Sequence, residues 1–336
     1  MGPTILAIET SCDETAAAVI RGGNILANIV ATQAVHQKYG GVVPELASRA
    51  HQQNVVPVVT EALSVAKVTK TKLDAVAFTQ GPGLLGALLV GSSFAKSLAL
   101  SLNVPLIAVD HMQAHILAHF IEEPRPPFPF LCLTVSGGHT QIVRINSPLD
   151  MEVLGTTTDD AVGEAFDKGA KILGLPYPGG PLLDKLAAKG NPDRFSFSMT
   201  NMPDYNFSFS GIKTSFLNFI RNNEQKNPKF VEENLHDLCA SLQRHLIDML
   251  LQKLELASRE TGITHIAIAG GVSANSRLRW KMERQVTKLG WRVYIPAFQY
   301  CTDNAGMVAM AAHFMYTEGK FAKQEISPDP RLKFGV

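Results

Sequence analysis

The pattern of apolar and polar positions divides the chain into two halves with the same order of predicted elements. In the first half, short apolar runs separated by turns predict a strand meander. An apolar helical pattern follows from 44 to about 66, with a break expected near Pro57, and strands then alternate with helices. The predicted strands lie at 4–9, 15–20, 24–32, 74–79 and 105–109, and the later helices at 84–102 and from residue 111 onward.

The second half begins after a proline cluster at 124–129. Its predicted strands lie at 130–136, 140–145, 151–155, 265–269 and 292–295, and its predicted helices at 230–261, 274–289 and after 302. This repeated order indicates an α/β protein with two related lobes, at 1–125 and 126–336, and a ligand cleft at the carboxyl ends of the strands. A helical region at about 160–225 has no counterpart in the first half, so it is interpreted as an insertion.

Charge and cysteine content narrow the class of protein. The 336 residues contain 31 Lys and Arg against 30 Asp and Glu, which excludes a protein that binds nucleic acid through a strongly basic composition. The apolar stretch 84–109 is interrupted by Lys96 and Pro105, and the N-terminus lacks a basic segment, so neither a membrane span nor a signal peptide is expected. Four separated cysteines form no zinc or disulfide pattern, which favours a cytoplasmic protein.

Three strand ends carry small and hydroxyl residues, at 9–15, 135–140 and 269–275. Paired glycines let backbone amides approach an anion, and hydroxyl groups add donors, which is the chemistry of a phosphate-binding loop. A tight hairpin is the alternative for each glycine pair taken alone. The third segment leaves a strand and opens a helix, where the helix dipole favours an anion.

A metal site is suggested by His111 and His115, which lie one helical turn apart and share a helix face. The alternative is that these histidines are ordinary surface or core residues without a metal. His119 continues the same spacing by one more helical turn. A zinc protease would need a glutamate directly after the first histidine, where this chain has Met112. The duplication offers Asp303 as a third ligand facing the histidines across the cleft, and such a set suits Fe(II) or Zn(II).

The two phosphate loops and the Gly270-Gly271 loop resemble those of the actin, sugar-kinase and Hsp70 superfamily. The resemblance implies two ribonuclease-H-like lobes, a nucleotide and metal cleft between them, and a ligand that contains adenosine and phosphate. It places Glu9 where that superfamily has the acidic residue that closes the first strand. It also implies that the following residues contact the nucleotide: Thr134, Val135, Ser136, Gly137, Gly138, Asp167, Gly180, Asp184 and Asn275.

Several motifs in combination resemble one family, the bacterial tRNA threonylcarbamoyladenosine transferases, formerly described as O-sialoglycoprotein endopeptidases. The resemblance covers essentially the whole chain. The motifs are Ile8-Glu9-Thr10-Ser11-Cys12-Asp13-Glu14-Thr15, residues 40–49, Gln80-Gly81-Pro82-Gly83, His111-x-x-x-His115, Val135-Ser136-Gly137-Gly138-His139-Thr140, Phe207-Ser208-Phe209-Ser210-Gly211 and Cys301-Thr302-Asp303-Asn304.

This resemblance implies transfer of a threonylcarbamoyl group from threonylcarbamoyl-AMP to adenosine 37 of tRNAs that read ANN codons, with release of AMP. His111, His115 and Asp303 would bind Fe²⁺ or Zn²⁺, and the nucleotide residues would hold the adenylate or an ATP or ADP analogue. The implied partners are tRNA, a non-catalytic paralogue, a small P-loop ATPase and the adenylate-forming enzyme, with no membrane partner. For the general base, Glu14, Glu45 and His139 are candidates because they lie in motifs near the predicted cleft.

Two other functions fit the same fold, because a fold does not decide function. An ATPase or small-molecule kinase would need the nucleotide loops but not the histidine pair. A nucleotide-binding scaffold without catalysis would leave a partner's activity intact after loss of the metal ligands. The basic side chains Arg277, Lys281, Arg284 and Lys288 share one face of a predicted helix and are either tRNA phosphate contacts or a solvated surface.

Overall fold

The computed structural model describes residues 2–334 except 34–35, 37–38 and 198–201. The chain folds into two compact units. Unit 1 comprises Met1–Pro126, Ser147–Met151 and Pro296–Val336, and unit 2 comprises Pro127–Asn146 and Glu152–Ile295. Residues 296–336 therefore pack with the N-terminal residues, whereas the sequence pattern predicts a second lobe at 126–336 that includes them.

Unit 1 is built on a five-stranded sheet of order β3-β2-β1-β4-β5. Strand β1 runs antiparallel to β2 and parallel to β4, and β4 runs parallel to β5. Parallel strands end at the same edge of a sheet, so β1, β4 and β5 bring their last residues together. The strands are β1 (Thr4–Glu9), β2 (Thr15–Arg21), β3 (Asn24–Ala31), β4 (Ala75–Gly81) and β5 (Leu106–Asp110).

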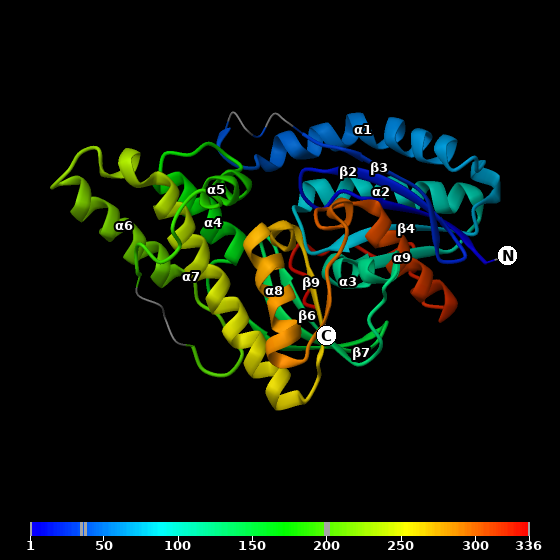
Figure 1. Cartoon of the computed structure of the whole chain (residues 1–336). Helices are drawn as coiled ribbons and strands as arrows, with labels where there is room; N and C mark the ends of the chain where they lie inside the picture. Colours follow the sequence, from blue (N-terminus) through cyan, green and yellow to red (C-terminus); the bar gives the residue numbers. More distant parts are fainter. Residues whose placement is uncertain (1, 34–35, 37–38, 198–201, 335–336) are drawn as a thin grey trace. The chain divides into compact units, whose positions relative to one another are not determined.

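Helices cover the sheet of unit 1. Leu6 and Ile8 of β1 belong to one apolar core with Val55 and Ala95, which lie on two adjacent helices, α1 and α2 (Figure 1). Helix α9 contacts β1, β2, β3 and β5 as well as α3. The helices and helical turns of unit 1 are α1 (Pro44–Val65), η2 (Lys70–Lys72), α2 (Leu85–Leu102), α3 (His111–Leu117), η3 (Ala118–Phe120), η5 (Phe298–Tyr300) and α9 (Ala305–Thr317).

The predicted break of the first helix near Pro57 is wrong, because α1 continues through this residue. A proline inside a helix removes one hydrogen bond and costs about 3 kcal/mol. Val55, Val58 and Val59 are buried on both sides of it. Burial of a valine side chain contributes roughly 1.5–3 kcal/mol, so packing of these residues outweighs the local cost.

Unit 2 is built on a second five-stranded sheet, of order β10-β9-β6-β7-β8. Its apolar core joins Leu131 and Leu133 of β6 to the long helix α7. The strands are β6 (Phe130–Val135), β7 (Thr140–Ser147), β8 (Asp150–Thr156), β9 (His265–Ala269) and β10 (Arg292–Tyr294). The helices and helical turns are α4 (Val162–Ile172), α5 (Gly179–Ala187), α6 (Ser210–Glu224), α7 (Phe230–Thr261), η4 (Gly271–Ala274) and α8 (Ser276–Leu289).

The two sheets have the same topology. Read from the matching edge, β8-β7-β6-β9-β10 repeats the order β3-β2-β1-β4-β5. The duplication expected from the sequence is therefore confirmed. The helix predicted at 274–289 begins at Ser276 instead of Ala274, because a helical turn over Gly271–Ala274 precedes it.

Within the described part of the chain, one helix is long and apolar enough by length and composition to cross a membrane. It is α2, which packs against α1 and β4 in unit 1. A core helix of a soluble protein meets the same criteria, so this is weak support for a membrane span.

Candidate metal centre and nucleotide-binding loops

The two histidines lie where β5 ends and α3 begins. Asp110 is the N-cap of α3, and its carboxylate accepts hydrogen bonds from the backbone N–H groups of Met112 and Gln113 at 2.7 and 3.0 Å. This cap fixes the first turn of the helix. His111 and His115 are both buried on one face, with ring centroids 4.7 Å apart.

Asp303 reaches the same place from the other end of the sequence. It precedes α9, whose N-cap Asn304 accepts a hydrogen bond from the Met307 backbone at 3.0 Å. The side-chain oxygen of Asn28, on β3, accepts a hydrogen bond from the Gly306 backbone at 3.0 Å. The sheet of unit 1 thus holds the start of α9, and with it Asp303, in place.

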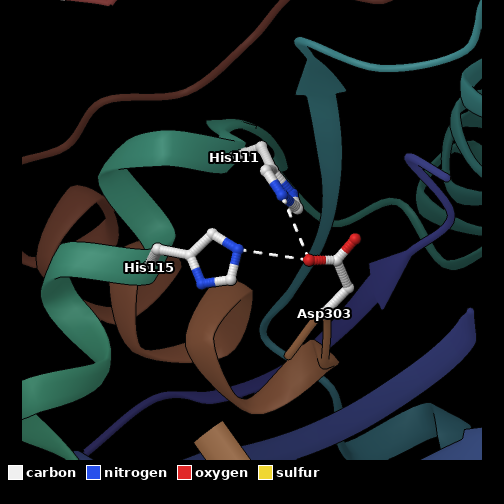
Figure 2. Close-up of side chains that lie close together, drawn as sticks. All are labelled: His111, His115 and Asp303. Carbon is white, nitrogen blue, oxygen red and sulfur yellow. Dashed lines mark hydrogen bonds and ion pairs between the residues drawn. The ribbon is translucent and has the colours of Figure 1, made fainter. Parts of the chain in front are cut away.

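The three side chains converge (Figure 2). Asp303 Oδ1 lies 3.2 Å from His115 Nε2 and 3.4 Å from His111 Nε2. One ligand atom from each residue falls within 4.8 Å of the others. Two imidazole nitrogens and one carboxylate oxygen are a ligand set that suits zinc or non-haem iron, so these residues fit a divalent metal. All three belong to unit 1.

Glu9 is the buried acidic side chain beside His111. The sequence pattern did not predict this contact. Its Oε2 lies 3.1 Å from His111 Nδ1 and accepts a hydrogen bond from the Thr79 hydroxyl at 2.5 Å. Its Oε1 accepts from the Ser11 backbone at 2.5 Å. A carboxylate after the four apolar residues Ile5-Leu6-Ala7-Ile8 was the available signal.

The charges in this cluster shift one another's protonation. Burial alone would raise the pKa values of Glu9 and Asp303, but His111 beside them holds both below their usual range. Burial alone would lower the pKa of His111, but Asp303 and Glu9 raise it well above its usual value. Burial lowers the pKa of His115, and the neighbouring His111 lowers it further. In the metal-free protein, His111 is therefore the cation that balances the two carboxylates.

A turn carrying Asp13 and Glu14 follows β1 and is anchored by the buried His51 of α1. His51 Nε2 donates to the Cys12 carbonyl oxygen at 3.0 Å, and the Thr15 hydroxyl lies 2.8 Å from His51 Nδ1. Burial lowers the pKa of His51, which favours the neutral ring that this pair of contacts needs. Burial and the nearby Asp303 and Asp13 carboxylates raise the pKa of Glu14 to about 9.

The three candidate bases have different surroundings. Glu14 lies close enough to Asp303 and Glu9 to interact with them electrostatically. Glu45 is exposed on the first turn of α1 and forms an ion pair with Arg49 at 2.6 Å. His139 belongs to unit 2, in the β6–β7 hairpin, where its backbone donates to the Ser136 hydroxyl at 3.0 Å.

The expected nucleotide residues gather at one end of the second sheet. Strands β6 and β9 are parallel neighbours, so the loops after Val135 and Ala269 leave the same edge. A Cβ on Gly270 would lie 2.5 Å from the Val135 carbonyl oxygen, so glycine allows these loops to touch. Gly270 also has a φ of +86°, a conformation that favours glycine.

Hydrogen bonds tie the helix starts of unit 2 to these loops. Gly163 of α4 donates to the Ser136 carbonyl oxygen at 3.1 Å. Asp167 Oδ1 accepts from the backbones of Gly179 and Gly180, both at 2.9 Å. Asp184 accepts from the backbone and hydroxyl of Ser276 at 3.1 and 2.7 Å.

The remaining residues of this set are placed by the same loops. Asn275 caps α8 through the Leu278 backbone at 3.0 Å. Thr134 and Val135 are buried in β6, whereas Gly137 and Gly138 are exposed. Among the residues that the structure describes, a Cβ on either glycine would meet no atom within 4 Å. The structure therefore brings all nine expected residues into one region of unit 2, with an open glycine pair among them.

Comparison with known proteins identifies a family. The sequence model described as "TsaD: tRNA N6-adenosine threonylcarbamoyltransferase" matches residues 24–310. A protein of Cytophaga hutchinsonii named tRNA N6-adenosine threonylcarbamoyltransferase is 61% identical over 335 residues, covering 100% of this chain and 98% of that protein. One of the same name from Christiangramia forsetii is 58% identical, with 98% of each chain covered.

Solved structures resemble the fold at low sequence identity. Full-length HypF in its phosphate- and nucleotide-bound form matches with a TM-score of 0.65 at 14% identity, over 95% of this chain and 47% of that one. Component A of the Acidaminococcus fermentans (R)-2-hydroxyglutaryl-CoA dehydratase matches with a TM-score of 0.54 at 15% identity, over 94% of this chain and 99% of that one. These likenesses concern the fold alone and agree with the two-lobed α/β architecture.

Proposed function

Because the chain belongs to the tRNA N6-adenosine threonylcarbamoyltransferase family, we propose that it performs the family's reaction with a divalent metal held by His111, His115 and Asp303. The reaction is transfer of a threonylcarbamoyl group to the N6 amine of an adenosine in tRNA. The observation that carries the proposal is the convergence of two buried imidazoles and one carboxylate on a common point.

The donor in this proposal is threonylcarbamoyl-AMP, and the acceptor is adenosine 37 in tRNAs that read ANN codons. The N6 amine attacks the carbamoyl carbon, the bond from that carbon to the phosphate oxygen breaks, AMP leaves, and the amine loses a proton. An aryl amine is a weak nucleophile, so orientation and charge stabilisation supply much of the rate. A bound Fe²⁺ or Zn²⁺ supplies Lewis acidity that polarises a carbonyl or fixes the threonyl end.

The adenylate is assigned to the loops of unit 2. Gly137 and Gly138 are exposed residues without side chains, which supports approach of a phosphate to their backbone. Asp167, Asp184 and Asn275 order the neighbouring helix starts and offer oxygen acceptors to a ribose or adenine. ATP or ADP analogues are expected to occupy the same loops.

Glu14 is the candidate that we favour for handling the proton of the amine. It interacts with the carboxylates around the histidines, whereas Glu45 is exposed and paired with Arg49. Its raised pKa of about 9 in the metal-free protein means that Glu14 holds a proton at neutral pH. A cation held by His111, His115 and Asp303 would favour the ionised form of Glu14, which is the form that can accept a proton.

The proposed partners are tRNA, a non-catalytic paralogue, a small P-loop ATPase and the adenylate-forming enzyme, all in the cytoplasm. Exposed apolar side chains on two helices of unit 1 support docking of the paralogue there. They are Val56 and Val65 on α1 and Leu85, Leu89 and Leu100 on α2.

The basic face of α8 is a proposed contact for tRNA. Its basic side chains differ in whether they already pair with a carboxylate of this chain. Lys281 pairs with Asp248, and Lys288 lies 3.9 Å from Glu255. Arg284 is exposed and stacks on the exposed Trp280, with its guanidinium carbon 4.6 Å from the ring centroid. Arginine and tryptophan together can contact both a phosphate and a base.

A reconstituted reaction tests the proposal. Threonine, bicarbonate, ATP, the adenylate-forming enzyme, the proposed partner subunits and unmodified tRNA are incubated with the wild type, His111→Ala or Asp303→Ala, and the tRNA nucleosides are measured by mass spectrometry. Loss of a metal ligand is expected to lower the rate by at least about a hundredfold, since several kcal/mol of transition-state stabilisation are lost. Metal analysis of the same purified proteins is expected to show about one iron or zinc per wild-type chain and much less in both variants.

Asp193→Ala is the matched control, because it removes an exposed carboxylate that pairs with Arg244 in unit 2. We expect this variant to retain both metal and activity. Undiminished threonylcarbamoyladenosine from both ligand variants would refute the metal role. Release of ADP from ATP by the purified chain alone, without the partner subunits and without modified adenosine in the full reaction, would instead indicate a kinase or ATPase.

A further inference from the structure

The carboxylate of Glu9 is fully buried and needs compensation for its lost hydration. Two of its hydrogen-bond donors, the Ser11 backbone and the Thr79 hydroxyl, are neutral. The third is the ring of His111, at 3.1 Å. His111 is therefore the partner that can balance the charge of Glu9, either as a cation or through a metal bound on its other nitrogen.

This contact determines which nitrogen of His111 faces the proposed metal. An ionised carboxylate only accepts hydrogen bonds, so Nδ1 must carry the proton and Nε2 keeps the lone pair in the neutral ring. Nε2 is also the atom directed toward Asp303, at 3.4 Å. Both nitrogens of His111 are thus in the arrangement that metal coordination requires.

His115 differs from His111 in this respect. Its Nε2 also faces Asp303, at 3.2 Å. Its Nδ1 is buried, however, and has no hydrogen-bond partner within the part of the chain that the structure describes. Glu9 therefore acts on one histidine of the pair.

We propose that Glu9 is a positioning residue of the metal centre, which accepts the Nδ1 proton of His111 and so presents Nε2 to a divalent cation. The inference rests on the proposed metal role of His111, His115 and Asp303. Carboxylates that hold metal-binding histidines in this way raise the basicity of the ring and fix its orientation.

Glu9→Gln tests the proposal with little change in shape. If the amide nitrogen faces His111, Nδ1 must accept, the proton moves to Nε2, and the metal position is blocked. If the amide oxygen faces His111, the amide nitrogen meets the Ser11 N–H, donor against donor. In both arrangements we expect zinc affinity, measured by competition with a chromophoric chelator, to fall about 10- to 100-fold.

Asp110→Asn is the matched control. It is also a carboxylate-to-amide change next to His111, but Asp110 caps the backbone of α3 through Met112 and Gln113. Asparagine caps a helix as well as aspartate does. Zinc affinity is expected to fall much less than in Glu9→Gln, because Asp110 accepts from the backbone of α3 and so supports the helix start rather than the His111 ring.

A second measurement needs no variant. In zinc-loaded wild type with ¹⁵N-labelled histidine, NMR is expected to show His111 protonated at Nδ1 and coordinated through Nε2. Wild-type zinc affinity in folded Glu9→Gln, an equal loss in Asp110→Asn, or coordination of His111 through Nδ1 would each overturn the role of Glu9. A wild type that binds no zinc would instead refute the metal centre itself.

Discussion

At the scale of single residues, close packing and open space distinguish the glycines of unit 2. Gly137 and Gly138 face open space, so a side chain there would occupy the proposed phosphate position without disturbing the fold. A Cβ on Gly163 would instead lie 2.6 Å from the Ser136 carbonyl oxygen. One type of glycine leaves room for a ligand, and the other lets the chain pack.

This difference predicts that a substitution at Gly137 lowers ligand affinity, whereas a substitution at Gly163 lowers stability. Gly137→Val is expected to weaken binding of a non-hydrolysable adenylate analogue by about tenfold or more, a change of at least about 1.4 kcal/mol, with an unchanged melting temperature. Gly163→Ala is expected to lower the melting temperature, because backbone atoms must shift. Calorimetric titration and thermal unfolding measure both, and full affinity in Gly137→Val would argue against a phosphate at this loop.

At the scale of elements, the ends of helices are held by residues far away in the sequence. Helix α6 begins at Ser210, and its N-terminus is capped by Asp159 from the segment after β8. The Asp159 carboxylate accepts from the Phe209 backbone at 2.7 Å and from the hydroxyls of Ser208 and Ser210 at 2.5 and 2.8 Å. The Phe-Ser-Phe-Ser-Gly motif noticed in the sequence thus has a structural role in starting this helix.

The stability that the Asp159 cap contributes depends on pH in a defined way. Burial raises the pKa of Asp159, but the hydrogen bonds from Ser208, Phe209 and Ser210 together outweigh burial and keep this pKa below its usual range. Its stabilisation is therefore complete above the ordinary pKa of aspartate and is lost as the pH falls through the lowered value. Asp159→Ala is expected to cost about 1 kcal/mol at neutral pH. In chemical unfolding, the difference in free energy of unfolding between wild type and Asp159→Ala should be constant from about pH 5 to 8 and become smaller below about pH 4. A difference that grows in acid would contradict this role.

At the scale of the whole molecule, unit 1 depends on the C-terminal part of the chain. Helix α9 contacts the sheet, and beyond it Asp329 donates to the Gln80 carbonyl oxygen at 2.9 Å. A Cβ on Gly81 would lie 1.8 Å from the Asp329 carbonyl oxygen, which shows how closely this segment packs on β4. Residues 1–126 alone thus lack part of their own core and one expected metal ligand.

A fragment test follows from this dependence. Residues 1–126 expressed alone are expected to lack cooperative unfolding and stoichiometric zinc binding. A chain that joins 1–126 to 296–336 through a flexible linker is expected to regain both, as judged by thermal unfolding and zinc titration. Cooperative unfolding and zinc binding by the short fragment would show that α9 is dispensable.

The sequence by itself determined the strands of both sheets, the duplicated order and the histidine pair, but not the division of the region at about 160–225 into three helices. These follow from local periodicity and from spacing along one helix, which short-range physics decides. It did not predict that α1 continues through Pro57, because burial of Val55, Val58 and Val59 outweighs a local preference.

The tertiary structure decided which side chains meet. Glu9 and His111 are 102 residues apart, and His115 and Asp303 are 188 apart. Their contacts depend on β1 and β5 ending at one edge of the sheet and on α9 returning to it. No local sequence pattern encodes contacts between residues so far apart in the sequence, because these contacts arise from the packing of whole elements. The sequence therefore supplied the candidate ligands, and the fold supplied the carboxylate that orients one of them.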